Sequence, residues 1–157
     1  MKCSASRAET NIVALSSTCH DKETTAMALL WDDSMTTGVE ELDDAHKKLF
    51  LWVNKLSDAM KAGKGSDEVM RILDFLGNYA TAHFSSEEGC MNRYKCPTAL
   101  ANKKAHGEFL AYFTKMKTEC QANGVTTVKV LELQKALSNW LKNHIMKIDV
   151  ALVSCVK

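Results

Sequence analysis

The chain of 157 residues contains a single proline, Pro97, and only seven glycines. Average usage of about 5% would give roughly eight prolines in a chain of this length. Because β-sandwiches need proline and glycine at their many turns, this scarcity disfavours a β-sandwich and favours long helices. The length corresponds to one domain, large enough to bury a core without help from disulfides or a metal.

The sequence also lacks the features of membrane-bound, secreted or nucleic-acid-binding proteins. A net charge of +1 and an isoelectric point near 7.6 supply no basic field for nucleic acid or an anionic membrane. No apolar run reaches the roughly 18 residues that span a bilayer, and the first residues lack the apolar stretch of a secretion signal. We therefore expect a cytoplasmic protein that binds neither nucleic acid nor membrane. Its six cysteines form no CxxC pair and are expected to be reduced thiols.

The hydrophobic pattern divides the chain into two parts. Residues 1–30 are rich in Ser, Thr and Ala without a sustained apolar period, which predicts a flexible N-terminal arm. A short extended segment is predicted at residues 31–39, and the 3.6-residue period of amphipathic helices follows it. The folded domain is therefore expected to span residues 31–157.

Four amphipathic segments predict four helices, at about residues 40–62, 66–88, 98–122 and from 126 or 127 to at least 148. Gly63 and Gly124 are expected to end the first and third, and the second would stop before a loop at residues 89–97. The residues expected to point inward from the third helix are Leu100, Phe109, Leu110, Phe113 and Met116. Four helices with short connections predict an all-α, up-down-up-down four-helix bundle.

Each predicted helix carries one histidine on its apolar stripe. His46 lies four residues from both Leu42 and Phe50, and the other three inward histidines are His83, His106 and His144. A single inward histidine is more often a hydrogen-bonded core residue than a ligand. Four buried imidazoles without partners would each cost about 1–3 kcal/mol, against a total stability of about 5–15 kcal/mol. A shared metal site would offset this cost.

Two carboxylates accompany the histidines. Glu87 follows His83 by four residues, about 40° round the helix and one turn along, so both reach one centre. Asp149 follows His144 by five residues, about 140° away on an ideal helix, so spacing alone does not place it. Imidazoles with carboxylates suit iron better than calcium or magnesium, and closed zinc sites usually use cysteine. The chain contains no HExxH, Glu-x-x-His, GxGxxG, P-loop or GxSxG motif.

Three runs of sequence resemble the bacterial hemerythrins. They are GVEELDDAHKKLF at residues 38–50, HFSSEE at residues 83–88 with Met91 and Tyr94, and WLKNHIMKID at residues 140–149. The resemblance covers about residues 31–150. It implies a non-haem site of two iron ions, joined by an oxo or hydroxo bridge, that binds dioxygen reversibly.

The resemblance also implies a role for each inward polar residue. Two histidines would hold each iron and two carboxylates would bridge the pair: His46 and His83 on one iron, His106 and His144 on the other, and Glu87 and Asp149 as the bridges. Apolar residues beside these ligands would line a dioxygen pocket, and ordinary core packing explains them equally well: Leu49, Phe84, Leu141 and Ile145.

One position departs from the family pattern. The family's third helix carries His-x-x-x-His, whereas this sequence has Asn102 before His106, which reduces five histidine ligands to four. An asparagine carbonyl oxygen is a much poorer iron ligand than imidazole. The second iron would therefore have an open position that admits water, small anions or oxidants, unless the site is lost altogether.

The open position favours a domain that senses oxygen or redox state and regulates an attached or partner output module. By the resemblance, that module would be a signalling domain such as a diguanylate cyclase. The apolar residues 150–156 would connect to it or form a last turn packed on the bundle. The alternative is a free-standing oxygen carrier or store. Because no acid or base is visible beyond the ligands, an enzyme is not expected, and an oxidase or peroxidase activity is the third interpretation.

Overall fold

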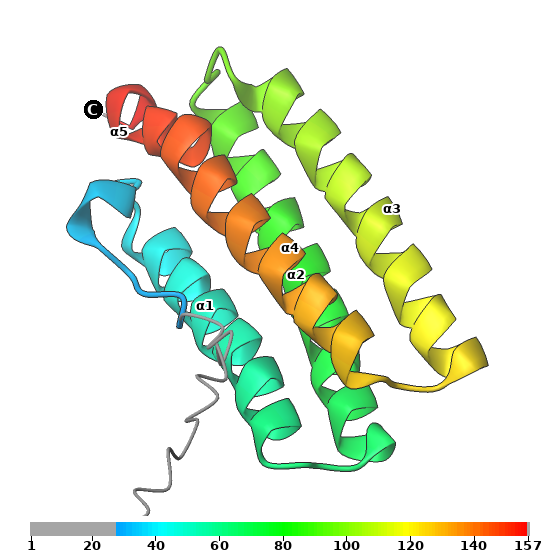
Figure 1. The fold of residues 1–157 in the computed structure, drawn as a ribbon. Helices are drawn as coiled ribbons and strands as arrows, with labels where there is room; N and C mark the ends of the chain where they lie inside the picture. Colours follow the sequence, from blue (N-terminus) through cyan, green and yellow to red (C-terminus); the bar gives the residue numbers. More distant parts are fainter. Residues whose placement is uncertain (1–27, 157) are drawn as a thin grey trace, which may run out of the picture.

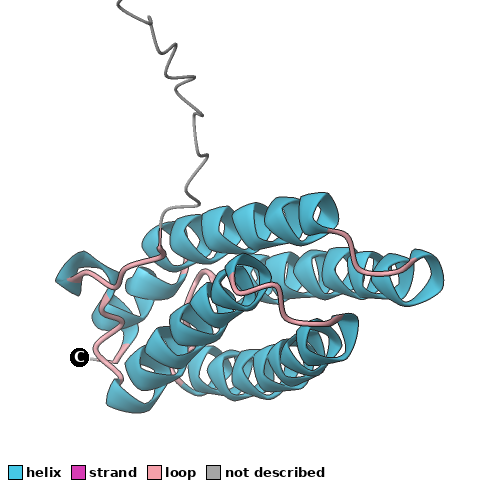
Figure 2. Cartoon of the chain, turned by 60° about the horizontal axis from the view of Figure 1, so that its bottom comes forward, coloured by secondary structure: helices cyan, strands magenta, loops and turns pink. Residues whose placement is uncertain are grey.

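The computed structural model describes residues 28–156. Its four long helices are α1 (Glu40–Lys61), α2 (Ser66–Arg93), α3 (Ala99–Asn123) and α4 (Thr127–Lys147). Short helical elements flank them: η1 (Asp33–Met35), η2 (Asp149–Ala151) and α5 (Leu152–Cys155). No strand occurs between residues 28 and 156, and the connections between the long helices are short (Figure 2). The prediction of an all-α four-helix bundle is confirmed.

The helices alternate in direction, so the chain connections gather at two ends of the bundle (Figure 1). The α1–α2 and α3–α4 connections lie at one end, and the α2–α3 connection lies at the other, near α5. Gly63 and Gly124 follow α1 and α3 with φ of 62° and 81°, a left-handed conformation that side chains other than glycine rarely adopt. The Thr126 hydroxyl accepts a hydrogen bond from the Lys129 N–H and caps the start of α4.

The inner faces of the four helices form one main core of buried aliphatic and aromatic side chains. α2 and α3 pack closely at Gly77, where an added Cβ atom would lie 2.9 Å from Phe113 Cε1. Among the described residues, no helix combines the length and apolar character needed to cross a bilayer.

A second, smaller group of buried side chains closes the end of the bundle at which α5 lies. We call it the end cluster; it consists of Leu42, Met91, Cys96 and Leu152. Cys96, in the α2–α3 connection, is joined by a disulfide to Cys155 at the end of α5. The expectation of reduced thiols is therefore wrong for these two residues. It holds for Cys90 and Cys120, which are free thiols.

Several predicted boundaries differ from the structure. α2 continues past Glu88 to Arg93, because Gly89 is tolerated inside a helix whose next turn buries Met91 completely. The segment at residues 31–39, predicted to be extended, contains the 3-10 helix η1. The last predicted helix ends at Lys147, and the chain turns before η2 and α5 pack against the bundle.

One predicted side-chain orientation on α3 differs from the structure. Leu100 was expected to point inward and is 82% exposed. It lies about 200° round α3 from Asn102, which is buried on the same face as His106.

The predicted flexible arm lies outside the described residues except for residues 28–30. Of these, Leu29 is buried, and its backbone N–H and C=O both hydrogen-bond to the Asn54 side chain.

Candidate metal centre

One buried histidine from each long helix points into the bundle near the end cluster. All four side chains are at most 6% exposed: His46 on α1, His83 on α2, His106 on α3 and His144 on α4. Two carboxylates lie among them, Glu87 on α2 and Asp149 on η2, and both are fully buried. The structure thus brings all six residues together at one place in the fold.

The backbone between α4 and η2 determines where Asp149 points. Ile148 leaves the helical conformation, with φ of −120° and ψ of −55°, and the chain continues as a 3-10 helix. The five-residue step from His144 therefore no longer places Asp149 about 140° away, as an unbroken helix would. Asp149 Oδ1 lies 3.2 Å from His144 Nε2.

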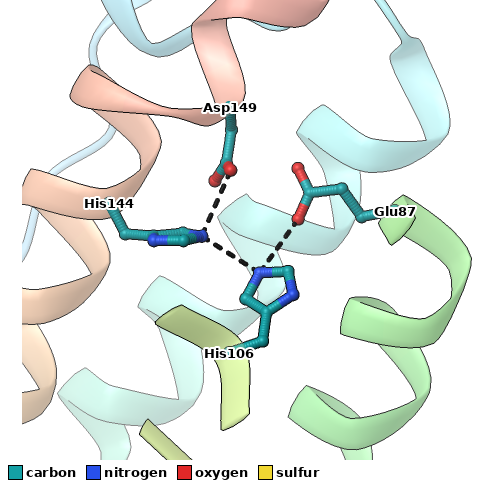
Figure 3. Close-up of side chains that lie close together, drawn as sticks. All are labelled: Glu87, His106, His144 and Asp149. Carbon is teal, nitrogen blue, oxygen red and sulfur yellow. Dashed lines mark hydrogen bonds and ion pairs between the residues drawn. The ribbon is translucent and has the colours of Figure 1, made fainter. Parts of the chain in front are cut away.

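The candidate ligand atoms form two overlapping groups, and within each group the atoms lie within 4.8 Å of one another. The first group contains His46, His83 and Glu87. The second contains Glu87, His106, His144 and Asp149, whose side chains come from four different elements and point toward one another in Figure 3. Because Glu87 belongs to both groups, the two candidate positions for a cation are neighbours.

Each carboxylate faces histidines of both groups. Glu87 Oε2 lies 3.4 Å from His106 Nε2 and 3.8 Å from His83 Nε2, and Glu87 Oε1 lies 4.0 Å from His46 Nε2. Asp149 directs Oδ1 to His144, and its Oδ2 lies 3.5 Å from His46 Nε2. A carboxylate with one oxygen toward each of two positions has the geometry of a bridging ligand.

Many polar atoms at this centre are buried without a hydrogen-bond partner. They are His46 Nδ1, His83 Nδ1, Asn102 Oδ1 and both carboxylate oxygens of Glu87 and of Asp149. An unpaired buried polar atom costs about 1–3 kcal/mol, and buried polar groups in proteins are normally satisfied. Unsatisfied carboxylate oxygens that face imidazole Nε2 atoms are the donor set expected where a cation binds.

Burial also sets the protonation of the histidines. Loss of solvation lowers the pKa of His46 to about 4 and that of His83 to about 3. Burial lowers the pKa of His106 as well, against the opposing effect of Glu88. These imidazoles are neutral at neutral pH, which is the form that binds a metal.

The two carboxylates differ in their electrostatic surroundings. Burial raises the pKa of Glu87, and the neighbouring Asp149 carboxylate raises it further. Burial acts to raise the pKa of Asp149 too, but contact with His144 and the charges of His144, His46 and His106 outweigh it and lower that pKa. In the absence of a cation, Glu87 is therefore the carboxyl of this crowded pair that retains a proton at neutral pH.

Outside the candidate ligands, Glu88 makes a contact that the sequence did not predict. Glu88 Oε1 lies 3.1 Å from His106 Nδ1. A proton on Nδ1 donated to Glu88 leaves Nε2 with its lone pair directed toward Glu87 and His144. Because Glu88 lies on α2 and His106 on α3, helical spacing carried no signal for this contact.

Asn102, the residue in place of a family histidine, is fully buried. Its Nδ2 donates a hydrogen bond to Met91 Sδ, at 3.3 Å, and its Oδ1 has no partner. Met91 belongs to the end cluster and is also fully buried. The Asn102 side chain is therefore fixed through its Nδ2 atom, while its Oδ1 atom is free to accept a hydrogen bond or contact a cation.

Aromatic rings and aliphatic side chains surround the centre. Phe84 stacks on His106 with ring centroids 3.8 Å apart, and Trp140 stacks on His144 at 4.2 Å. A closed apolar cavity of about 10 Å³ lies within the main core, next to the centre. Of the four residues predicted to line a dioxygen pocket, three line this cavity and Ile145 is buried outside it: Leu49, Phe84 and Leu141.

A bundle with one buried histidine per helix and two buried carboxylates between them defines a metal-binding helical protein. Residues 37–155 match the family model described as the hemerythrin HHE cation binding domain. The chain belongs to the hemerythrin family. The resemblance identified from the sequence is thereby confirmed, and the cluster of histidine, glutamate and aspartate side chains is its candidate iron-binding site.

Known relatives agree with this assignment. The chain is 31% identical over 129 residues to the bacteriohemerythrin of Pseudomonas aeruginosa (strain LESB58), with 82% of each chain covered. It is 31% identical over 121 residues to a hemerythrin-like protein of Naegleria gruberi, which covers 76% of this chain and 87% of that protein. A crystal structure of wild-type hemerythrin superposes with a TM-score of 0.74 at 29% identity, covering 83% of this chain and 98% of that one.

Proposed function

We propose that this domain holds two iron ions at the candidate centre and binds dioxygen there to sense oxygen or redox state. The observation that supports two ions is the orientation of the carboxylates. Asp149 turns one oxygen to His144 and the other to His46, and Glu87 likewise faces both groups of histidines. A single ion would leave half of these imidazoles and carboxylate oxygens unsatisfied.

In this proposal the ligands are His46 and His83 for one iron, His106 and His144 for the other, and Glu87 and Asp149 for both. When bound, an iron pair supplies two electrons and a coordination position for dioxygen. The protein provides neutral imidazoles, an apolar surrounding that excludes water, and Glu88, which orients His106 through its Nδ1.

Asn102 is the reason to favour sensing over storage. Its carbonyl oxygen is a weak donor to iron, and its amide is engaged by Met91 Sδ. The α3–α4 side of the centre therefore has one imidazole fewer than the family pattern and keeps a position that exchangeable ligands, including small anions, can occupy. Easier oxidation of the iron suits a domain that reports oxidants.

The position of Asp149 favours coupling of the centre to an attached or partner output module. Asp149 lies on η2, which continues directly into α5 and the end cluster. If oxidation displaced the Asp149 carboxylate, the segment at residues 149–156 would therefore move with it. The signalling partner proposed from the resemblance, such as a diguanylate cyclase, would receive the change through this segment.

A free-standing carrier or store is the second candidate. The closed apolar cavity formed by Leu49, Phe84, Leu141 and their neighbours favours it, because exclusion of water slows loss of bound dioxygen. An oxidase or peroxidase is a weaker third candidate, since the described residues offer no positioned acid or base beyond the proposed ligands and Glu88.

The deciding experiment mixes the reduced, iron-loaded protein with dioxygen in a stopped-flow spectrometer. Immediate passage to the oxidised spectrum supports sensing, whereas a long-lived visible band of the oxygenated protein supports carriage. Metal analysis comes first: a purified chain with zinc and no iron contradicts both candidates.

Asn102→His tests the role of the missing ligand. We expect the oxygenated form to persist longer by on the order of tenfold, the scale typical of single changes around a metal site. Asn92→His, at an exposed position on α2, is the control and should leave the lifetime unchanged. If Asn102→His oxidises as fast as the parent, our account of Asn102 is wrong.

A further inference from the structure

The disulfide between Cys96 and Cys155 joins two segments that both lead to the candidate metal centre. Its Cα atoms are 5.6 Å apart, and 59 residues separate the two cysteines in sequence. Cys96 follows Met91, whose Sδ accepts the hydrogen bond from Asn102. Cys155 ends the short η2–α5 segment that begins with Asp149. The bond therefore ties the connection before α3 to the segment that supplies a carboxylate.

Apart from the disulfide, side-chain packing holds the η2–α5 segment to the bundle. Leu152 is fully buried in the end cluster, and Val153 and Val156 pack beside Gly38, where an added Cβ atom would lie 3.8 Å from each. The helix α5 has only four residues, so its own backbone hydrogen bonds contribute little. Short helical elements of this kind open locally more easily than the long helices of a core.

The two cysteines differ in exposure. Cys96 is 5% exposed, whereas Cys155 is only partly buried. A thiolate from solution can therefore approach the disulfide at Cys155, with Cys96 as the leaving group. Cys90 packs against the same end cluster but is a free thiol, and burial raises its pKa.

We propose that Cys96 and Cys155 are a reversible thiol–disulfide pair that controls how firmly the Asp149 segment is held, and thereby how fast metal leaves the centre. The effect on metal rests on the proposed function. The effect on the segment itself does not require a metal.

A low-molecular-weight thiol such as glutathione can reduce the Cys96–Cys155 disulfide by thiol–disulfide exchange. Its thiolate attacks Cys155 Sγ, the bond between the two protein sulfurs breaks, and Cys96 leaves as a thiolate that takes a proton. A second thiolate attacks the small-molecule sulfur of the mixed disulfide and releases Cys155. Two electrons pass from two small thiols to the protein, and a small disulfide is the product. The oxidised small disulfide drives the reverse reaction.

Reduction leaves the η2–α5 segment attached to the bundle by packing alone. Local opening of this segment then removes Asp149 from both groups of histidines at once, since Asp149 faces His46 as well as His144. The oxidised protein keeps the segment closed and retains metal. The pair would thus couple thiol redox state to metal retention.

The test uses the full chain loaded with cobalt(II), which binds imidazole and carboxylate ligands and gives a visible spectrum. One sample is reduced with a phosphine and desalted, and the other is kept oxidised. Differential alkylation followed by peptide mass spectrometry verifies the state of each cysteine. We expect transfer of cobalt to excess chelator to be faster in the reduced sample by on the order of tenfold, the scale seen when the support of a ligand is lost.

Two variants separate the pair from general thiol effects. Cys155→Ser should release cobalt at the fast rate with or without the phosphine. Cys90→Ser, in the same end cluster, should keep the full difference between oxidised and reduced protein.

Equal release rates for samples whose Cys96–Cys155 bond is verified as intact and as broken would overturn the proposal. Failure of oxidised glutathione to re-form the bond would overturn its reversibility. If the chain binds no cobalt, the proposed function fails, and hydrogen exchange then decides the remaining claim. Amides of residues 149–156 must exchange faster after reduction if the pair holds this segment, and unchanged exchange refutes it.

Discussion

The two sides of the candidate centre are built differently. On the α1–α2 side, the Nδ1 atoms of His46 and His83 are buried and have no partner. On the α3–α4 side, His106 Nδ1 meets Glu88, and aromatic rings stack on both His106 and His144. The α1–α2 side thus holds its imidazoles by packing, and the α3–α4 side adds an outer carboxylate.

This difference bears on the missing family histidine. The side that has Asn102 in place of an imidazole is also the side on which the remaining α3 histidine is oriented by Glu88. An oriented imidazole with a carboxylate behind it is a stronger donor than an imidazole without one. The asparagine and the histidine supported by Glu88 therefore lie on the same side of the candidate centre.

Removal of the carboxylate shared by both sides should have the largest effect. Glu87→Ala takes a ligand from both groups, so we expect metal content to fall to near zero. His83→Ala takes a ligand from the α1–α2 side alone and should leave about one metal per chain, since the other group is intact. Metal analysis of the purified variants measures both, with Glu41→Ala, exposed at the start of α1, as the control. Equal losses from the two variants would show that the sides are not separate.

A smaller effect is expected from the outer carboxylate. Glu88→Gln keeps an oxygen near His106 Nδ1 but removes the charge, so affinity on the α3–α4 side should fall by roughly 10-fold, the lower end of the 10–100-fold range for such partners. Competition titration with a chelator measures this loss. Glu108→Gln, which removes an exposed glutamate paired with Lys104 on α3, should change nothing. An unchanged affinity in Glu88→Gln would remove the asymmetry between the sides.

A further prediction concerns the pH dependence of metal affinity. Because burial raises the pKa of Glu87, the metal-free protein keeps a proton on this carboxyl at neutral pH, and a cation must displace it. Affinity should therefore rise as pH increases toward that pKa, by up to about tenfold per pH unit for one proton. The pKa values of about 4 and 3 for His46 and His83 mean that these histidines release no proton there.

A pH indicator in weakly buffered solution counts the protons released when metal is added. About one proton per chain agrees with the assignment to Glu87. Release of three or more would mean that the histidines of the α1–α2 side are protonated in the metal-free protein, contrary to their buried environment.

Helical periodicity was sufficient to predict the features that depend on one helix at a time. The burial of His46, His83, His106 and His144 follows from their spacing to apolar neighbours, and all four are buried. The same reasoning failed at Leu100, near the start of α3, where it assigned an inward direction to a residue that is 82% exposed. A single apolar residue at a helix start does not define a face.

Features that depend on the backbone between elements, or on two distant elements, had no sequence signal. The change of backbone conformation at Ile148 brings Asp149 to the centre, and no glycine or proline near residue 148 predicts that change. Glu88 and His106 lie on different helices, and Cys96 and Cys155 are 59 residues apart. Family resemblance assigned Asp149 a role, whereas only the folded chain shows the other two contacts.

The two groups of ligands also differ in how much of the chain each requires. His46, His83 and Glu87 come from α1 and α2, which are consecutive and antiparallel, so docking of this one hairpin assembles the whole group. The other group needs α2, α3, α4 and η2 to meet. Contacts between neighbouring elements form faster than those that close long loops. Assembly of the first group therefore needs a shorter closure of the chain than assembly of the second, and Glu87 is the residue that the two groups share.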